Sequence, residues 1–168
     1  IESNKVNYLK TIAQAYEARK NYAEAAIWYN KILSIKKEYG KVDMYNAGYN
    51  YFRSGVFDSS INVFNKYIAK FPEDIFGYYM VGKANWGIDT TMSMGLANPS
   101  FEKAVSIGEA NPDKSKNKSQ LLGSYKYLIA HAVNILKDKN AALAYCDKVL
   151  LIDSADQETL NNKVAIAK

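Results

Sequence analysis

The hydrophobic residues of this chain recur at spacings of three and four along most of its length. That spacing is the period of one face of an α-helix. Short polar or glycine-containing stretches, such as Ser54-Gly55 and Lys137–Asn140, interrupt the pattern at the places where turns are expected. The pattern therefore predicts an all-α protein built of short antiparallel helix pairs.

The same arrangement of residues returns along the chain. Residues 44–72 read Met44-x2-Ala47-Gly48-x2-Tyr51, then Gly55, then Ser60-x3-Phe64-x2-Tyr67 and Pro72. A shift of 35 residues toward the N-terminus takes Gly48 to Ala13, and a shift of 34 toward the C-terminus takes it to Gly82. A fourth copy reads Ile129-Ala130-x2-Val133, then Ala142-x3-Cys146-x2-Val149. Four copies in series indicate a helical repeat protein, although each copy alone is a weak signal.

This pattern resembles that of the tetratricopeptide repeat (TPR) family, W-x2-L-G-x2-Y followed by A-x3-F and a closing Pro. The resemblance implies a right-handed superhelical stack of antiparallel helix hairpins, a TPR-like α-solenoid of about four repeats plus a C-terminal helix. We expect a single domain over residues 1–168, with repeats at about 6–39, 41–74, 75–110 and 113–156. Residues 157–168 are expected to form a capping helix or the first helix of a fifth repeat.

Small residues stand where the two helices of a hairpin must approach each other. On the first helices they are Ala13, Gly48, Gly82 and Ala130, and on the second helices Ala25, Ser60, Ala97 and Ala142. Aromatic residues beside them, such as Tyr29, Phe64 and Phe101, fill the remaining space, because protein interiors are close-packed. These pairs of small and large residues are the predicted core contacts.

The third copy is longer than the others. Gly82 and Ala130 are 48 residues apart where 34 are expected, so 14 extra residues enter. Some lie in an insertion near residues 89–95, and the rest, around 111–120, are expected to lengthen the first helix of the fourth repeat. The block from Gly87 to Lys103 is similar to a variant repeat of bacterial TPR proteins that sit in the cell envelope. That resemblance implies a periplasmic or cell-envelope location, and a start at Ile1 suits either a processed chain or a piece of a longer one.

The sequence contains few of the residues and motifs that are typical of catalytic, nucleotide-binding or metal-binding sites. The 168 residues include one His and one Cys, and no P-loop or dinucleotide-binding glycine motif occurs. His131 has no recognisable catalytic partner, and Cys146 occupies a motif position that is normally a buried aromatic. We therefore expect no enzyme activity, no cofactor and no metal site. No run of residues is long and apolar enough to predict a membrane span.

The TPR resemblance implies that the first helix of each repeat lines a concave groove that holds a partner peptide. The predicted groove residues are Lys10, Gln14, Tyr45, Asn46, Tyr49, Phe52, Arg53, Tyr79, Lys83, Trp86, Tyr127 and His131, and the same mapping adds Asn7, Glu17 and Asn134. The carboxylate clamp of chaperone-binding TPR domains is not expected. Lys10 and Asn46 match it, but Gln14 replaces an Asn, and Phe76 and Met80 stand where the third-repeat cations belong.

The leading functional hypothesis is a protein- or peptide-binding scaffold or adaptor. The alternative is a structural spacer or self-association element of a larger envelope protein, which allows a homo-oligomer. Nucleic acid is a weaker candidate, because the lysines behind the net charge of +5 cluster in turns away from the aromatic positions. Carbohydrate stacking on the aromatic residues has no residue pattern that favours it.

Overall fold

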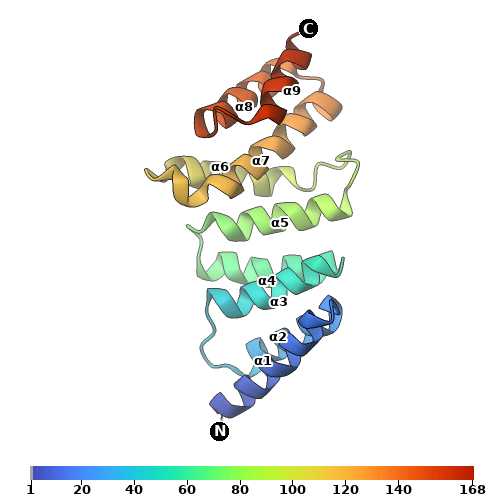
Figure 1. Ribbon diagram of the computed structural model, residues 1–168, viewed down its shortest axis with the longest axis vertical. Helices are drawn as coiled ribbons and strands as arrows, with labels where there is room; N and C mark the ends of the chain where they lie inside the picture. The colour runs from blue at the N-terminus through green and yellow to red at the C-terminus, as the bar shows by residue number, and fades with distance from the viewer. Residues whose placement is uncertain (1) are drawn as a thin grey trace. The chain divides into compact units, whose positions relative to one another are not determined.

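The computed structural model describes residues 2–168, and over these residues the chain forms nine α-helices and no β-strand. The chain divides into two compact units, Ile1–Pro72 and Glu73–Lys168. Within each unit, consecutive helices run antiparallel and pack on one another (Figure 1). The all-α prediction is confirmed, whereas the single-domain and repeat boundaries remain predictions.

The first unit contains α1 (Glu2–Ala18), α2 (Tyr22–Ile35), α3 (Lys41–Arg53) and α4 (Phe57–Lys70). The turns between the helices use left-handed backbone at Lys20, with φ 58°, and at Gly55, with φ 77°. Asn21 begins α2, and its side-chain oxygen accepts the Glu24 N–H at 3.3 Å. Side-chain caps of this kind satisfy backbone donors that have no partner within the helix.

The core of the first unit consists of the predicted small and aromatic residues. Ala13, Ala25, Ala47, Ser60 and Phe64 are all fully buried. The Ser60 hydroxyl donates a hydrogen bond of 2.9 Å to the Gly48 carbonyl oxygen, which joins α3 to α4. The predicted close approach of the two helices at Gly48 and Ser60 is therefore present.

The second unit contains α5 (Ile75–Ile88), α6 (Asn98–Ala110), α7 (Lys118–His131), α8 (Lys139–Ile152) and α9 (Gln157–Ala167). A 3₁₀ turn, Lys114–Asn117, leads into α7, and a π-helical turn, Ala132–Leu136, follows it. Aspartates begin three of these helices: Asp74, Asp138 and Asp156 each accept a backbone N–H two or three residues further on. Of the extra residues near 111–120, Lys114–Asn117 form this 3₁₀ turn and the last three begin α7. Because α7 starts 12 residues before Ala130, whereas α3 starts 7 residues before Gly48, the predicted lengthening toward the N-terminus is present in part.

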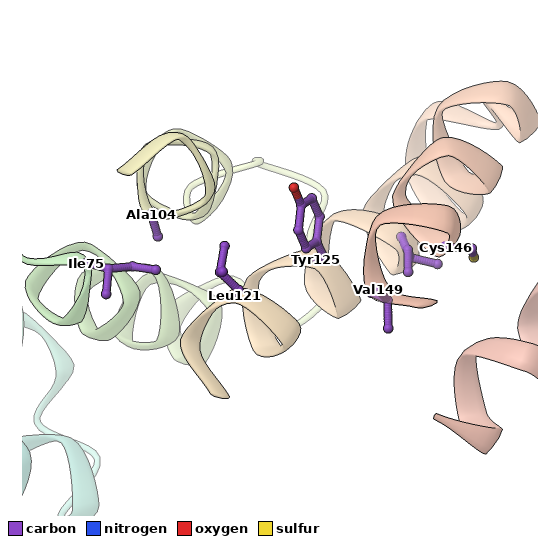
Figure 2. Close-up of a cluster of buried hydrophobic side chains, with 7 residues drawn as sticks. Ile75, Ala104, Leu121, Tyr125, Cys146 and Val149 are labelled. Atoms are coloured by element: carbon purple, nitrogen blue, oxygen red, sulfur yellow. The ribbon is translucent and has the colours of Figure 1, made fainter. Parts of the chain in front are cut away.

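One core cluster of the second unit is centred on α7. Figure 2 shows Leu121 and Tyr125 of α7 between Ile75 and Ala104 on one side and Cys146 with Val149 on the other. Burial raises the pKa of the Cys146 thiol. A thiol that is fully buried and resists ionisation is a packing residue, as the sequence predicted.

A second cluster joins the insertion to the helices. Met92 and Ala97 pack with Phe101, Tyr127 and Leu128. The insertion is therefore an ordered loop with its own buried side chains. Ala130 differs from the other predicted small positions, because it is only half-buried and lines a surface pocket.

Candidate functional site

An aromatic ladder runs along α3 in the first unit. The ring centroids of Tyr45 and Tyr49 are 5.1 Å apart with planes 17° from parallel, and those of Tyr49 and Phe52 are 6.3 Å apart at 15°. Tyr45 is 39% exposed, and the other two rings are half-buried. Positions three and four residues apart on a helix lie on one face, so α3 presents a continuous aromatic surface.

Arg53 completes one end of this ladder. Its guanidinium carbon lies 3.6 Å from the ring centroid of Tyr22 on α2 and 5.8 Å from that of Tyr49. The guanidinium also donates a hydrogen bond to the Tyr22 hydroxyl. Stacking on aromatic faces holds an arginine in place while leaving donors for a partner. We call Tyr45, Tyr49, Phe52 and Arg53 the α3 surface.

The end of α1 is tied to α3 by a carboxylate. Glu17 accepts hydrogen bonds of 2.7 Å from both Tyr29 Oη and Asn50 Nδ2. Burial, followed by the hydrogen bond to Glu17, raises the pKa of Tyr29. Glu17, predicted as a position next to the groove, therefore serves packing between helices.

The predicted groove residues Lys10 and Gln14 are exposed on α1. They lie seven and three residues before Glu17, on the same side of the helix. Asn46 is half-buried, and its backbone oxygen accepts a hydrogen bond of 2.8 Å from Asn50 Nδ2. The carboxyl group of Glu17 and the guanidinium of Arg53 both influence the pKa of Tyr45, which burial raises. The α3 surface thus lies within electrostatic range of the α1 residue Glu17.

In the second unit the structure separates the predicted groove residues by exposure. Trp86 is 40% exposed, whereas Tyr127 and His131 are only 2% and 6% exposed. Tyr127 packs its ring 4.5 Å from Phe101 and 5.4 Å from Trp86. Tyr127 and His131 are therefore not exposed groove residues, and this part of the prediction is corrected.

His131 has neighbours at the start of α6, at the end of the insertion and on its own helix. Asn98 Nδ2 lies 3.1 Å from His131 Nε2, and the neighbouring Gly95 approaches the same nitrogen. The Tyr127 ring stacks on the imidazole with 13° between the planes. The imidazole is thus enclosed by the loop and by its own helix.

Tyr79 and Lys83 of α5 are half-buried. The Tyr79 ring packs edge-on to Phe101, with centroids 6.0 Å apart, and its hydroxyl lies against Gly123 of α7. The Lys83 ammonium lies 5.7 Å from the centroid of the Tyr79 ring. Tyr79 therefore acts mainly in packing α5 against its neighbours, and Trp86 is the most exposed of the predicted groove aromatics in this unit.

A pocket of about 500 Å³ lies on α7, the π-helical turn, the start of α8, and α9. Its lining consists of Lys126, Ile129, Ala130, Val133, Asn134, Lys137, Lys139, Glu158, Asn162, Ala165 and Ile166. The sequence analysis placed only Asn134 near a binding surface. Residues 157–168 were expected to form a cap or the first helix of a fifth repeat, and the π-helical turn leaves no signal in the spacing of apolar residues.

The described residues contain no group of three or more His, Cys, Asp or Glu side chains placed to hold a metal ion. Among the same residues, no helix combines the length and the hydropathy that crossing a membrane requires. The polar groups found at the two surfaces are amides, lysines, one arginine, one glutamate and tyrosines.

Comparisons with known proteins agree with this architecture. Residues 8–39 match the family model described as tetratricopeptide repeat. The structure is similar to the C-terminal part of a TPR repeat-containing protein from Cytophaga hutchinsonii, with a TM-score of 0.84 and 21% identity over 95% of this chain. The present chain spans 60% of that structure's length. A search of curated proteins finds no match.

A second solved structure is less similar. It is a thermophilic TPR protein from Thermus thermophilus, with a TM-score of 0.50 and 14% identity over 99% of both chains. At these identities the likeness concerns the fold. The fold that these structures share with the chain is that of a helical-repeat protein.

The chain is similar to tetratricopeptide repeat proteins, over residues 8–39 in sequence and over most of its length in fold. Its predicted fold class, an all-α TPR-like α-solenoid, is confirmed.

Proposed function

We propose that the chain is a non-catalytic scaffold or adaptor that binds a protein or peptide partner through the α3 surface. The observation that carries the proposal is the aromatic ladder with Arg53 at its end. Tyrosine and arginine are the residues most enriched among the contacts that dominate protein–protein binding. They provide large contact areas at a small cost in conformational entropy.

The arrangement favours a peptide over a small molecule. The three rings follow one helix over about two turns, a length of roughly 10 Å, which matches three extended residues of a partner. Arg53 provides donors for a carboxylate or a backbone carbonyl at one end. Lys10 and Gln14 on α1 add further polar contacts in this proposal.

Trp86 plays the matching part in the second unit, as an exposed aromatic on α5. Its indole is supported on one side by Tyr127, which leaves its other side available to a partner. A ring that is already held by its neighbours loses little entropy when it binds.

The proposal can be tested by selecting a phage-displayed library of random peptides on the intact chain. The affinity of the selected peptides is then measured for the wild-type protein and for Tyr49→Ala/Arg53→Ala and Trp86→Ala variants. We expect the double variant to lose about tenfold or more in affinity, because interface truncations of this type cost about 2 kcal/mol or more.

Tyr8→Ala is the matched control. Tyr8 is 68% exposed on α1, two residues from Lys10 and therefore on a different side of that helix. Its removal is expected to leave affinity unchanged. Equal affinity of the selected peptides for the wild type and for the double variant, with both proteins folded by circular dichroism, would contradict the assignment of the α3 surface.

A further inference from the structure

Five of the residues that line the pocket on α7, the π-helical turn and α9 are apolar, and we call them its apolar floor. Ile129, Ala130 and Val133 provide one side of it, and Ala165 with Ile166 of α9 provides the other. A pocket of about 500 Å³ is large enough for two or three aliphatic side chains and is within the usual range of ligand sites. Burial of an aliphatic side chain on this floor removes apolar surface from water, which favours binding.

Positively charged residues outnumber negatively charged residues in the lining of the pocket. Three lysines and one glutamate line the pocket, which is a formal balance of +2. Lys126 and Glu158 pair with each other at 2.7 Å, and Lys126 also contacts Asp156 at 2.8 Å. Lys137 and Lys139 are exposed and pair with no carboxylate among the residues that the structure describes. The positive charge available to a ligand therefore lies at the edge formed by these two lysines.

The shape of that edge comes from the π-helical turn. The turn ends at Lys137, which has left-handed backbone with φ 55°, and the Asp138 N–H then donates to the Ala132 carbonyl oxygen at 3.0 Å. The helix therefore stops abruptly beside the floor, and α8 begins at Lys139. Both lysines line the pocket, Lys137 from this sharp turn and Lys139 from the start of α8. Single π turns in helices often mark functional sites.

Two amides identify the ligand more closely. Asn134 and Asn162 line the pocket from the π-helical turn and from α9, and both are exposed. Among the described residues, neither side chain makes a hydrogen bond within the chain. Each amide offers two donors and one acceptor, which is the complement of a peptide backbone. A fatty acid would use the floor and the lysines but would leave these amides without partners.

We propose that this pocket is a second binding site, for a peptide segment in which aliphatic side chains alternate with carboxylates. The aliphatic side chains enter the floor, the carboxylates pair with Lys137 and Lys139, and the amides hold the backbone. This site is chemically different from the α3 surface, and the inference does not depend on the function proposed for that surface.

The experiment measures fluorescence anisotropy of three labelled pools of capped heptapeptides with the intact chain. In the first pool Asp or Glu alternates with Leu, Ile or Val. In the second and third pools the acidic residues are replaced by Asn or Gln, and by Lys or Arg. We expect the acidic pool to bind about tenfold more tightly than the amide pool, and to weaken as salt rises from about 0.05 M to about 0.5 M.

Two variants test the assignment to the pocket. Lys137→Glu/Lys139→Glu is expected to reduce the affinity for the acidic pool by about tenfold or more, because the charges then repel the ligand. Ala165→Trp fills the floor without changing any charge, and it is expected to abolish binding. Lys103→Glu is the matched control, because Lys103 is exposed on α6 outside the pocket and is expected to have at most a small effect.

Three results would overturn the proposal. One is equal binding of the acidic and amide pools. Another is undiminished binding of the acidic pool by the Lys137→Glu/Lys139→Glu variant, with native circular dichroism. The third is binding of octanoate that depends on both lysines when no peptide pool binds, which would make the pocket a fatty-acid site.

Discussion

Gly48 of α3 lies against the ring of Phe64 of α4, so closely that a Cβ atom at residue 48 would be 2.8 Å from ring atoms Cε2 and Cζ. The second unit repeats the relationship, because a Cβ at Gly82 of α5 would be 2.9 Å from Phe101 of α6. Carbon atoms at such distances overlap, and both rings are fully buried with no free space to move into. The absence of a side chain at these two positions therefore permits the helix pairs to pack.

We expect Gly48→Leu to destabilise the first unit. Overpacking of a close-packed interior costs about 1–3 kcal/mol, and a leucine adds more than one methyl group at this position. Urea unfolding followed by circular dichroism measures the change. Gly40→Ala is the control, since nothing lies within 4 Å of a Cβ at residue 40, and its effect is expected to stay below about 1 kcal/mol. Equal stability of the wild type and Gly48→Leu would contradict the packing described.

This relationship was readable from the sequence. Small residues 34 or 35 positions apart, each followed by an aromatic residue on the next helix, predicted the helix pairs and most of their contacts. Such contacts join neighbouring helices, so the local period of the chain determines them. The same reasoning predicted the aromatic positions of the α3 surface.

The environment of Tyr127 and His131 was not readable in this way. Their spacing placed them on the side of α7 where a groove was expected, but their burial depends on an insertion 30 to 40 residues earlier in the chain. Met92 in that loop has positive φ, 62°, and packs with Tyr127. Neither feature leaves a periodic signal in the sequence.

The contact between Gly123 and Tyr79 was not predicted either. A Cβ at residue 123 would be 2.7 Å from the Tyr79 hydroxyl, and this contact joins α5 and α7, which are not consecutive helices.

A second prediction concerns Glu17. We expect Glu17→Ala to destabilise the first unit by about 1–3 kcal/mol, because it removes the acceptor for Tyr29 and for the buried Asn50 side chain. A double-mutant cycle with Tyr29→Phe, read by urea unfolding, measures the coupling between the two residues. The coupling should be about 0.5 kcal/mol or more, since the side chains are in direct contact. Strictly additive losses would mean that the hydrogen bond contributes nothing measurable.

A third prediction concerns pH. Glu109 of α6 accepts hydrogen bonds of 2.8 Å from Lys148 and from Tyr125, and these contacts, led by that with Lys148, hold its pKa below the ordinary value of 4.5. A depressed carboxyl pKa stabilises the folded state at pH values above 4.5, and this contribution is lost as the pH falls through the lowered value. The pair is partly exposed, so we expect only about 0.5–1 kcal/mol from it.

Urea unfolding of the wild type and of Glu109→Gln at pH 7 and at pH 3 measures this contribution. The variant should be less stable at pH 7, and the difference should become smaller toward pH 3, as the pH falls below 4.5 toward the lowered pKa of Glu109. Glu102→Gln on the same helix is the control, because Glu102 is exposed and forms no ion pair with the described residues. A difference between wild type and Glu109→Gln that is the same at both pH values would rule out the assigned linkage.

The last prediction concerns the loop between α5 and α6. Asp89 is 3% exposed, and its Oδ2 accepts the Met94 N–H at 3.0 Å, while Oδ1 is 3.4 Å from the Thr91 hydroxyl. This carboxylate closes the loop that carries Met92 into the core. We expect Asp89→Ala to destabilise the second unit by about 1–3 kcal/mol, because a backbone donor then loses its acceptor. Hydrogen exchange at the Met94 amide should become faster in the folded protein.

Two further variants separate the roles of charge and geometry in this loop. Asp89→Asn keeps an oxygen that can accept the Met94 N–H, so it should retain most of the protection of that amide. Thr90→Ala, at an exposed neighbouring position, should change neither the stability nor the exchange rate. If the Met94 amide exchanges at the same rate in the wild type and in Asp89→Ala, then the packing of Met92 alone orders the loop. In that case the Asp89 carboxylate would not be what orders the loop. Burial and the charge of Asp89 both raise the pKa of Tyr127, so the contact between these two residues would be tested next.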